Sequence, residues 1–354
     1  MTSNGSVTIS LLWRLAMIAV TAALVMLSAC APTVRPTVSG NGSAANGSAH
    51  TPTLTSDRYV AADGTSLPVA VWPAATAAPK AVILGLHGFG DYRKAWDEPA
   101  QIWAKDGITT YSYDQRGFGS SPTRGRWPGT EALVGDAKAM VSLLRARYPG
   151  VPLYLAGESM GGAVALVAED QGAQVDGLIL LATALRSRDT FGPVATAGLW
   201  FFAHTIPWFP SGPTSIDYKP TDNPKTLEKL RNDPQILRQA RLDMGYGLVD
   251  LMDAARESAS RVHVPYLMLH GLGDRIIPQQ PVKAAIEIMP PRPDSKLAFY
   301  EEGYHLLLRD KEGKTVAADI AVWIANHEAP LPSGAEAARS HPDLAALWGS
   351  KRSR

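Results

Sequence analysis

The sequence is nearly free of cysteine and of net charge. Its 354 residues include one cysteine, Cys30, and 34 Lys and Arg against 33 Asp and Glu leave a formal net charge of +1. A single cysteine excludes an internal disulfide framework and a thiolate-based zinc cluster. The neutral balance argues against a nucleic-acid partner, since such proteins usually carry a basic face. Cys30 is therefore a core residue, a nucleophile or an attachment point, and its neighbours decide which.

The only apolar segment near the N-terminus is short. Leu15–Leu27 is an apolar run of 13 residues after Arg14. A charge followed by an apolar run is the order of a secretory signal, and the run is short for a membrane span. It leads into Leu27-Ser28-Ala29-Cys30, which resembles the lipobox of bacterial lipoproteins. The resemblance implies a signal peptide over residues 1–29 and lipidation of Cys30.

This lipobox sets the expected location of the protein. A lipidated Cys30 places it in the bacterial cell envelope, anchored to a membrane by lipid. Ala31, which is not the aspartate of inner-membrane retention, favours the outer membrane where one exists. The alternative is an uncleaved signal that anchors the chain in the inner membrane. A Cys30→Ala protein that stayed in the membrane fraction after secretion would contradict lipidation.

Beyond the signal, composition divides the chain into three parts. Residues 30–56 are rich in Gly, Ser, Asn, Thr and Pro and predict a flexible tether. Residues 57–327 alternate short apolar runs with helical patterns, which predicts an α/β domain with a mostly parallel central sheet flanked by helices. A proline-punctuated stretch at about 183–262 interrupts this rhythm and predicts a helical lid. Residues 328–354 are predicted to be a C-terminal tail.

The strongest chemical motif is Gly157-Glu158-Ser159-Met160-Gly161. It follows the predicted strand Leu153–Ala156 and opens a helical stretch. A strand-to-helix turn this sharp needs glycines on both sides of the serine, and it exposes the serine oxygen above the sheet. The alternative is a tight glycine turn with a capping serine. The motif predicts that Ser159 is a nucleophile.

Serine needs a base and an orienting carboxylate, which on this scaffold follow in the order Ser, Asp or Glu, His. Asp274 follows the predicted strand Tyr266–Leu269, and His305 follows the predicted strand Lys296–Tyr300. The carboxyl ends of parallel strands meet at one sheet edge, where catalytic groups gather. The sequence therefore predicts the catalytic set Ser159, Asp274 and His305.

An oxyanion needs two N–H donors. One is expected from the backbone of Met160, directly after the nucleophile. The other is expected from Phe89, in the glycine-containing loop His87–Asp91 that follows the predicted strand Ala81–Leu86. His87 itself is expected to stabilise this loop.

Together these motifs resemble one family. His87–Asp91, Asp114–Ser121, Gly157–Gly162, the loop at Asp274 and Gly303-Tyr304-His305 resemble the α/β-hydrolase group of monoacylglycerol lipases and bacterial lysophospholipases, as does Asn232-Asp233-Pro234 within the lid. The resemblance covers roughly residues 57–327 and implies the α/β-hydrolase fold, with the lid inserted before the strand that leads to Asp274. Glu158 departs from the animal lipases, which commonly have histidine at this position. The substrates of the animal enzymes are therefore a weaker guide to the substrate expected for this sequence.

The lid suggests the kind of substrate. Residues 199–209 contain five aromatic side chains, which form either the core of the lid itself or an apolar surface for an acyl chain or lipid: Trp200, Phe201, Phe202, Trp208 and Phe209. The expected function is hydrolysis of monoacylglycerol or lysophospholipid-type esters through an acyl-enzyme, with no metal or organic cofactor. The alternatives are a carboxylesterase, thioesterase or peptidase of this fold, or a non-catalytic lipid-binding lipoprotein. The sequence leaves the oligomeric state open.

Overall fold

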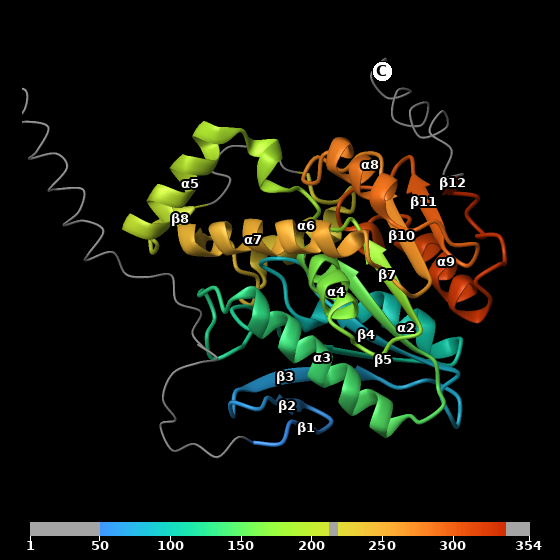
Figure 1. Cartoon of the computed structure of the whole chain (residues 1–354). Coiled ribbons are helices and arrows are strands. Elements are labelled where there is room, and N and C mark those ends of the chain that lie inside the picture. Colours follow the sequence, from blue (N-terminus) through green and yellow to red (C-terminus); the bar gives the residue numbers. More distant parts are fainter. Residues whose placement is uncertain (1–49, 212–218, 338–354) are drawn as a thin grey trace, which may run out of the picture.

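The computed structural model describes residues 50–211 and 219–337, and one sheet runs through its centre (Figure 1). The strands of this sheet are β1 (Thr53–Leu54), β2 (Arg58–Val60), β3 (Ser66–Trp72), β4 (Ala81–Leu86), β5 (Ile108–Tyr113), β6 (Leu153–Glu158), β7 (Gly177–Leu181), β10 (Tyr266–Gly271), β11 (Lys296–Tyr300) and β12 (Glu336–Ala337). The ten strands lie in the order β1-β2-β3-β5-β4-β6-β7-β10-β11-β12. The six central strands pair in parallel, and in sheet order they are β5, β4, β6, β7, β10 and β11. The antiparallel pairs lie toward the two edges.

Helices cover both faces of the sheet. One face carries α3 (Thr130–Arg147), α4 (Met160–Asp170), α7 (Leu242–Ala259) and α8 (Gln279–Ile288), and the other carries α2 (Asp97–Lys105) and α9 (Gly313–Ala325). Alternate residues of β4 enter opposite cores, with Leu84 on the first side and Ile83 on the second, because successive strand side chains point to opposite faces. Both faces are apolar, so the mostly parallel sheet flanked by helices is confirmed.

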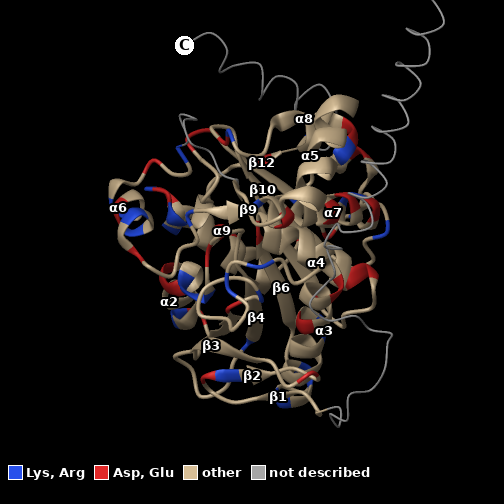
Figure 2. Cartoon of the chain, turned by 90° about the vertical axis from the view of Figure 1, so that its left-hand side faces the viewer, with Lys and Arg blue, Asp and Glu red and all other residues tan. Residues whose placement is uncertain are grey.

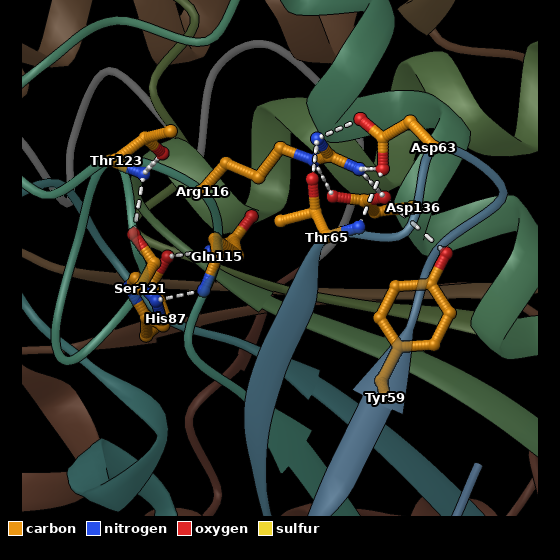
Figure 3. Close-up of polar contacts among 10 residues, drawn as sticks. Tyr59, Asp63, Thr65, His87, Gln115, Arg116, Ser121, Thr123 and Asp136 are labelled. Carbon is orange, nitrogen blue, oxygen red and sulfur yellow. Dashed lines mark hydrogen bonds and ion pairs between the residues drawn. The ribbon is translucent and has the colours of Figure 1, made fainter. Parts of the chain in front are cut away.

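β2 and β3 pair antiparallel and form a hairpin around Asp63 and Gly64. An ion cluster around the buried Arg116 guanidinium fixes it to the rest of the domain (Figure 3). Arg116 lies between Asp63 and Asp136, at 2.6 Å from an oxygen of each, and the Tyr59 hydroxyl donates to Asp136. The bond from Arg116 holds the pKa of Asp63 at about 2. The cluster ties the hairpin to α3.

The sheet extends beyond the predicted domain limits at both ends. Thr53–Leu54 was expected in the flexible tether but pairs with β2, because Leu54 is buried against the core. Glu336–Ala337 was expected in the tail but pairs with the edge strand β11, and Leu331 before it is buried. The fold therefore begins before residue 57 and continues past residue 327. Cys30, the predicted signal and the last part of the tail lie outside the described residues.

The predicted lid lies between β7 and β10. It contains the 3-10 helix η2 (Arg188–Phe191), α5 (Pro193–Thr205), α6 (Pro224–Asn232), a two-stranded ribbon of β8 (Pro210–Ser211) and β9 (Ala240–Arg241), and then α7. Helix α7 packs against α4, so this last part of the insertion also belongs to the layer that covers the sheet. In the described part of the chain, no helix is long and apolar enough to cross a membrane.

Candidate active site

Ser159 sits alone between a strand and a helix. β6 ends at Glu158 and α4 begins at Met160, and Ser159 between them has φ 53° and ψ −114°. A left-handed conformation is costly for a residue with a Cβ, and such strain persists only where the surroundings impose it. A Cβ on Gly157 would overlap the backbone of Gly161, and a Cβ on Gly161 would overlap that of Leu86. The turn therefore requires both glycines that the sequence pattern contains.

Asp274 and His305 form a buried pair in neighbouring loops. Asp274 follows β10 and His305 follows β11, and His305 Nδ1 lies 2.8 Å from Asp274 Oδ2. Asp274 Oδ1 accepts the N–H groups of Ile276 and Ile277. Burial opposes the charge of Asp274, but His305 and these hydrogen bonds outweigh it and lower the pKa of the carboxyl. An ionised Asp274 accepts the Nδ1 proton and leaves His305 Nε2 as the proton acceptor.

The sheet topology brings the predicted residues to one edge. β4, β6, β7, β10 and β11 are neighbours and run in parallel, so the loops that follow them leave the sheet at the same end. Ser159, Asp274 and His305 are therefore at the carboxyl edge of the sheet, as is the loop that contains Phe89.

The loop after β4 passes next to Ser159. A Cβ built on Gly88 would lie only 3.5 Å from Ser159 Cβ. His87 is fully buried, with Nδ1 bonded to the Gly88 carbonyl at 2.8 Å and Nε2 accepting the Gln115 N–H at 3.0 Å (Figure 3). Burial lowers the pKa of His87. A neutral His87 with both nitrogens bonded holds this loop in shape, as expected.

The two predicted oxyanion donors lie in the two segments that meet at Ser159, the loop after β4 and the start of α4. Phe89 belongs to the loop after β4 and packs edge-on against Phe118, with ring centroids 5.1 Å apart. Met160 is the buried first residue of α4, where the helix leaves backbone N–H groups without an intrahelical partner. The N-terminus of α4 also favours negative charge. Such a site suits an oxyanion beside Ser159.

One charged residue at the site was not predicted from the sequence. Arg309, at the end of the 3-10 helix η3 (Leu307–Arg309), contacts two carboxylates. Its Nη1 lies 2.6 Å from Asp91 Oδ2, and its Nη2 lies 2.5 Å from Glu158 Oε2. The sequence signal was present only in part, as a charged Glu158 at the end of an apolar strand, which requires a buried partner.

The lid aromatics lie at the surface. Five aromatic residues are each between 45% and 59% exposed: Trp200, Phe201, Phe202, Trp208 and Phe209. Ala203 is the buried residue of α5. Of the two expectations for this segment, the structure therefore favours an open apolar surface over a closed lid core. Helix α5 contains no Lys, Arg, Asp or Glu and is drawn wholly in tan, whereas α6 is charged (Figure 2).

A serine on a strained strand-to-helix turn, followed along the chain by an aspartate bonded to a histidine, all at the carboxyl edge of a mostly parallel sheet, defines an α/β-hydrolase. The family comparison narrows this class. Residues 77–312, well over half of the chain, match the Hydrolase_4 family, described as serine aminopeptidase, S33, and the chain belongs to that family.

Individual relatives are distant. Human monoglyceride lipase is 28% identical over 280 residues, which cover 76% of this chain and 90% of that protein. Monoacylglycerol lipase of Mycolicibacterium smegmatis is 25% identical over 256 residues, covering 70% of this chain and 89% of the relative. The crystal structure of Paleococcus ferrophilus monoacylglycerol lipase matches with a TM-score of 0.64 at 19% identity, covering 74% of this chain and 99% of that one. At this identity the structural likeness shows the shared fold.

Proposed function

We propose that this protein is a serine ester hydrolase that acts on monoacylglycerol or lysophospholipid-type acyl esters. The observation that carries the proposal is the buried 2.8 Å bond between His305 and Asp274, formed at the same sheet edge as the strained Ser159. A histidine oriented in this way serves as a general base for a serine hydroxyl. Relatives named as monoglyceride or monoacylglycerol lipases support the choice of an ester substrate.

The proposed reaction has two halves. Ser159 Oγ attacks the ester carbonyl while His305 Nε2 takes its proton, and the backbone N–H groups of Phe89 and Met160 hold the oxyanion. Collapse of the intermediate breaks the bond to the alcohol, which leaves with the proton from His305. Water, deprotonated by His305, then attacks the acyl-enzyme. As the bond to Ser159 Oγ breaks, His305 returns the proton to that oxygen and the fatty acid leaves. Asp274 stays ionised and stabilises the imidazolium throughout.

The exposed aromatic segment supports a lipid substrate. Residues 193–211, which contain no Lys, Arg, Asp or Glu, present large apolar side chains to solvent, and exposed apolar patches of this kind mark lipid or protein contacts. We propose that this surface receives acyl chains from a micelle or membrane. An anchor at Cys30 would keep the domain near such a surface.

The test begins with a serine-reactive fluorophosphonate probe and a substrate panel. The wild type is expected to be labelled, and Ser159→Ala is expected to lose labelling and to hydrolyse esters at least about a thousandfold more slowly. The panel compares monoacylglycerol, diacylglycerol, lysophospholipid and short p-nitrophenyl esters. An unlabelled wild type with no esterase activity would contradict the hydrolase, and equal rates on monoacyl and diacyl lipids would contradict the substrate class.

A peptidase is the second candidate because the family carries the description serine aminopeptidase. Aminoacyl anilides in the same panel separate the two activities. Turnover of an anilide with a free amino group, without turnover of acyl glycerides, would replace the esterase assignment and leave the roles of Ser159, Asp274 and His305 intact.

A further inference from the structure

A single guanidinium joins three loops of the candidate site. We propose that Arg309 is a positioning residue that holds the oxyanion loop, the nucleophile turn and the histidine loop in one catalytic arrangement. The inference rests on the proposed ester hydrolysis. It is based on a buried ion cluster, Asp91–Arg309–Glu158, to which each of these three segments contributes one residue.

Each member lies close in sequence to a residue with a proposed chemical role. Asp91 follows Phe89 in the oxyanion loop, Glu158 directly precedes Ser159, and Arg309 ends the short helix after His305. Arg309 uses separate nitrogens for its partners, Nη1 to Asp91 at 2.6 Å and Nη2 to Glu158 at 2.5 Å. A planar guanidinium fixes two such carboxylates at set angles, which a lysine ammonium does not do.

The cluster is almost free of solvent. The side chains of Arg309, Asp91 and Glu158 are 11%, 8% and 4% exposed. Burial disfavours the charge of Arg309, but Asp91 and Glu158 outweigh it and raise the pKa of the guanidinium, so Arg309 stays charged. Burial raises the pKa of Glu158, and the charge of Arg309 is the largest influence in the opposite direction. Buried ions are tolerated only in fixed geometry, so small displacements of any of the three loops are penalised.

The backbone of Arg309 also connects the cluster to the lid residues 221–237, here called the base of the lid. Its carbonyl accepts the hydroxyl groups of Thr221 at 3.2 Å and Thr226 at 2.9 Å. On the opposite side, the Leu237 N–H donates to the Gly90 carbonyl of the oxyanion loop at 2.7 Å. The lid base and the catalytic loops therefore form one bonded unit with Arg309 at its centre.

Replacement of Arg309 is therefore predicted to lower kcat without weakening substrate binding. Without Arg309, the oxyanion loop and the nucleophile turn lose their common partner, and a misplacement near 1 Å costs about a hundredfold in rate. Arg309→Met is expected to lower kcat for a short p-nitrophenyl ester about 10- to 100-fold, with KM changed less than about threefold. The rate of fluorophosphonate labelling should fall in parallel, and Arg309→Lys, which keeps the charge, should recover part of kcat.

Arg116→Met is the matched control, because Arg116 is also a buried guanidinium between two aspartates (Figure 3). Both variants are measured well below their melting temperatures. Arg116→Met should lower the melting temperature but keep kcat within about twofold, since its cluster joins a hairpin to α3. An equal loss of kcat in both arginine variants, or an unchanged kcat in Arg309→Met, would overturn the positioning role. If Arg309→Met does not fold, unchanged kcat values in Arg309→Lys and Glu158→Gln would overturn it as well. An inactive wild type would instead contradict the proposed function.

Discussion

At the scale of single residues, the carboxyl groups of the site differ in their hydrogen-bond partners and therefore in their proposed roles. Asp274 is held by His305 on one oxygen and by two backbone N–H groups on the other, so its charge and orientation are both fixed. Glu158 and Asp91 instead face Arg309 and have no proposed part in proton transfer.

The fixed Asp274 leads to a strong prediction. In Asp274→Asn the amide would donate to His305 Nδ1 instead of accepting from it, which favours the wrong tautomer, and kcat should fall about 10⁴-fold. Fluorophosphonate labelling should slow with it. Asp319→Asn is the control, because Asp319 is a buried acceptor of the Tyr300 hydroxyl at 2.7 Å on α9, outside the loops of the site. It should lose stability and keep kcat. Equal kcat losses in the two variants would count against an orienting role for Asp274.

The positions of three site residues in the fold could be predicted from chain order and local pattern. Ser159 lies in a strand–turn–helix signature, and Asp274 and His305 each follow an apolar run, so their common edge could be inferred. Arg309 and its partner Glu158 are 151 positions apart. No periodicity links them, and only the packing of three loops brings them together.

At the scale of elements, the lid has two parts that contact different regions of the protein. α6 and the segment after it are bonded to the loop that follows β4 in the candidate site, for instance by the Tyr92 hydroxyl to Asp233 at 2.6 Å and the Leu237 N–H to the Gly90 carbonyl at 2.7 Å. α5 packs against α7 and η2 and leaves its aromatic side chains at the surface. The sequence predicted a lid with an aromatic segment, but composition alone left its burial open, because helix α5 is apolar on every side.

The exposed face of α5 predicts a substrate-dependent defect. Phe201→Ser with Phe202→Ser removes two large apolar groups that are 45% and 49% exposed. Hydrolysis of micellar monoacylglycerol should fall about tenfold or more, because less apolar area is buried at the lipid surface. Turnover of soluble p-nitrophenyl acetate should stay within about twofold. Ile288→Ser on α8, which also replaces an exposed apolar residue, should change neither rate. A similar loss on both substrates would indicate a folding or active-site defect.

At the scale of the whole molecule, the parallel centre of the sheet was predictable and its two outermost strands, β1 and β12, were not. The apolar runs that became β4, β6, β7, β10 and β11 are buried along nearly all of their length, and such runs are visible in sequence. β1 and β12 have only two residues each, which is too short for a pattern. They join the sheet through backbone pairing to β2 and β11.

Burial of histidine in this core makes the stability of the whole fold depend on pH. His270 at the end of β10 is fully buried, both of its ring nitrogens lack a partner within the described residues, and burial lowers its pKa to about 4. In the unfolded chain its pKa is about 6.5. Below pH 6.5 the unfolded state therefore binds a proton that the folded state does not bind until about pH 4, so stability falls as the pH drops through this window. His87, whose pKa burial also lowers, acts in the same direction.

The contribution of His270 can be isolated by substitution. Between pH 7 and pH 5 it should remove about 2 kcal/mol of unfolding free energy from the wild type. His270→Gln keeps a polar side chain that does not titrate, so its free energy of unfolding should fall by about 2 kcal/mol less over the same interval. Urea denaturation at the two pH values measures this difference, and His50→Gln, at an exposed position, should retain the full dependence of the wild type. If His270→Gln lost as much stability on acidification as the wild type, the pKa of His270 would be the same in the folded and unfolded states, and the acid sensitivity would have to arise from His87 or from the carboxyl groups.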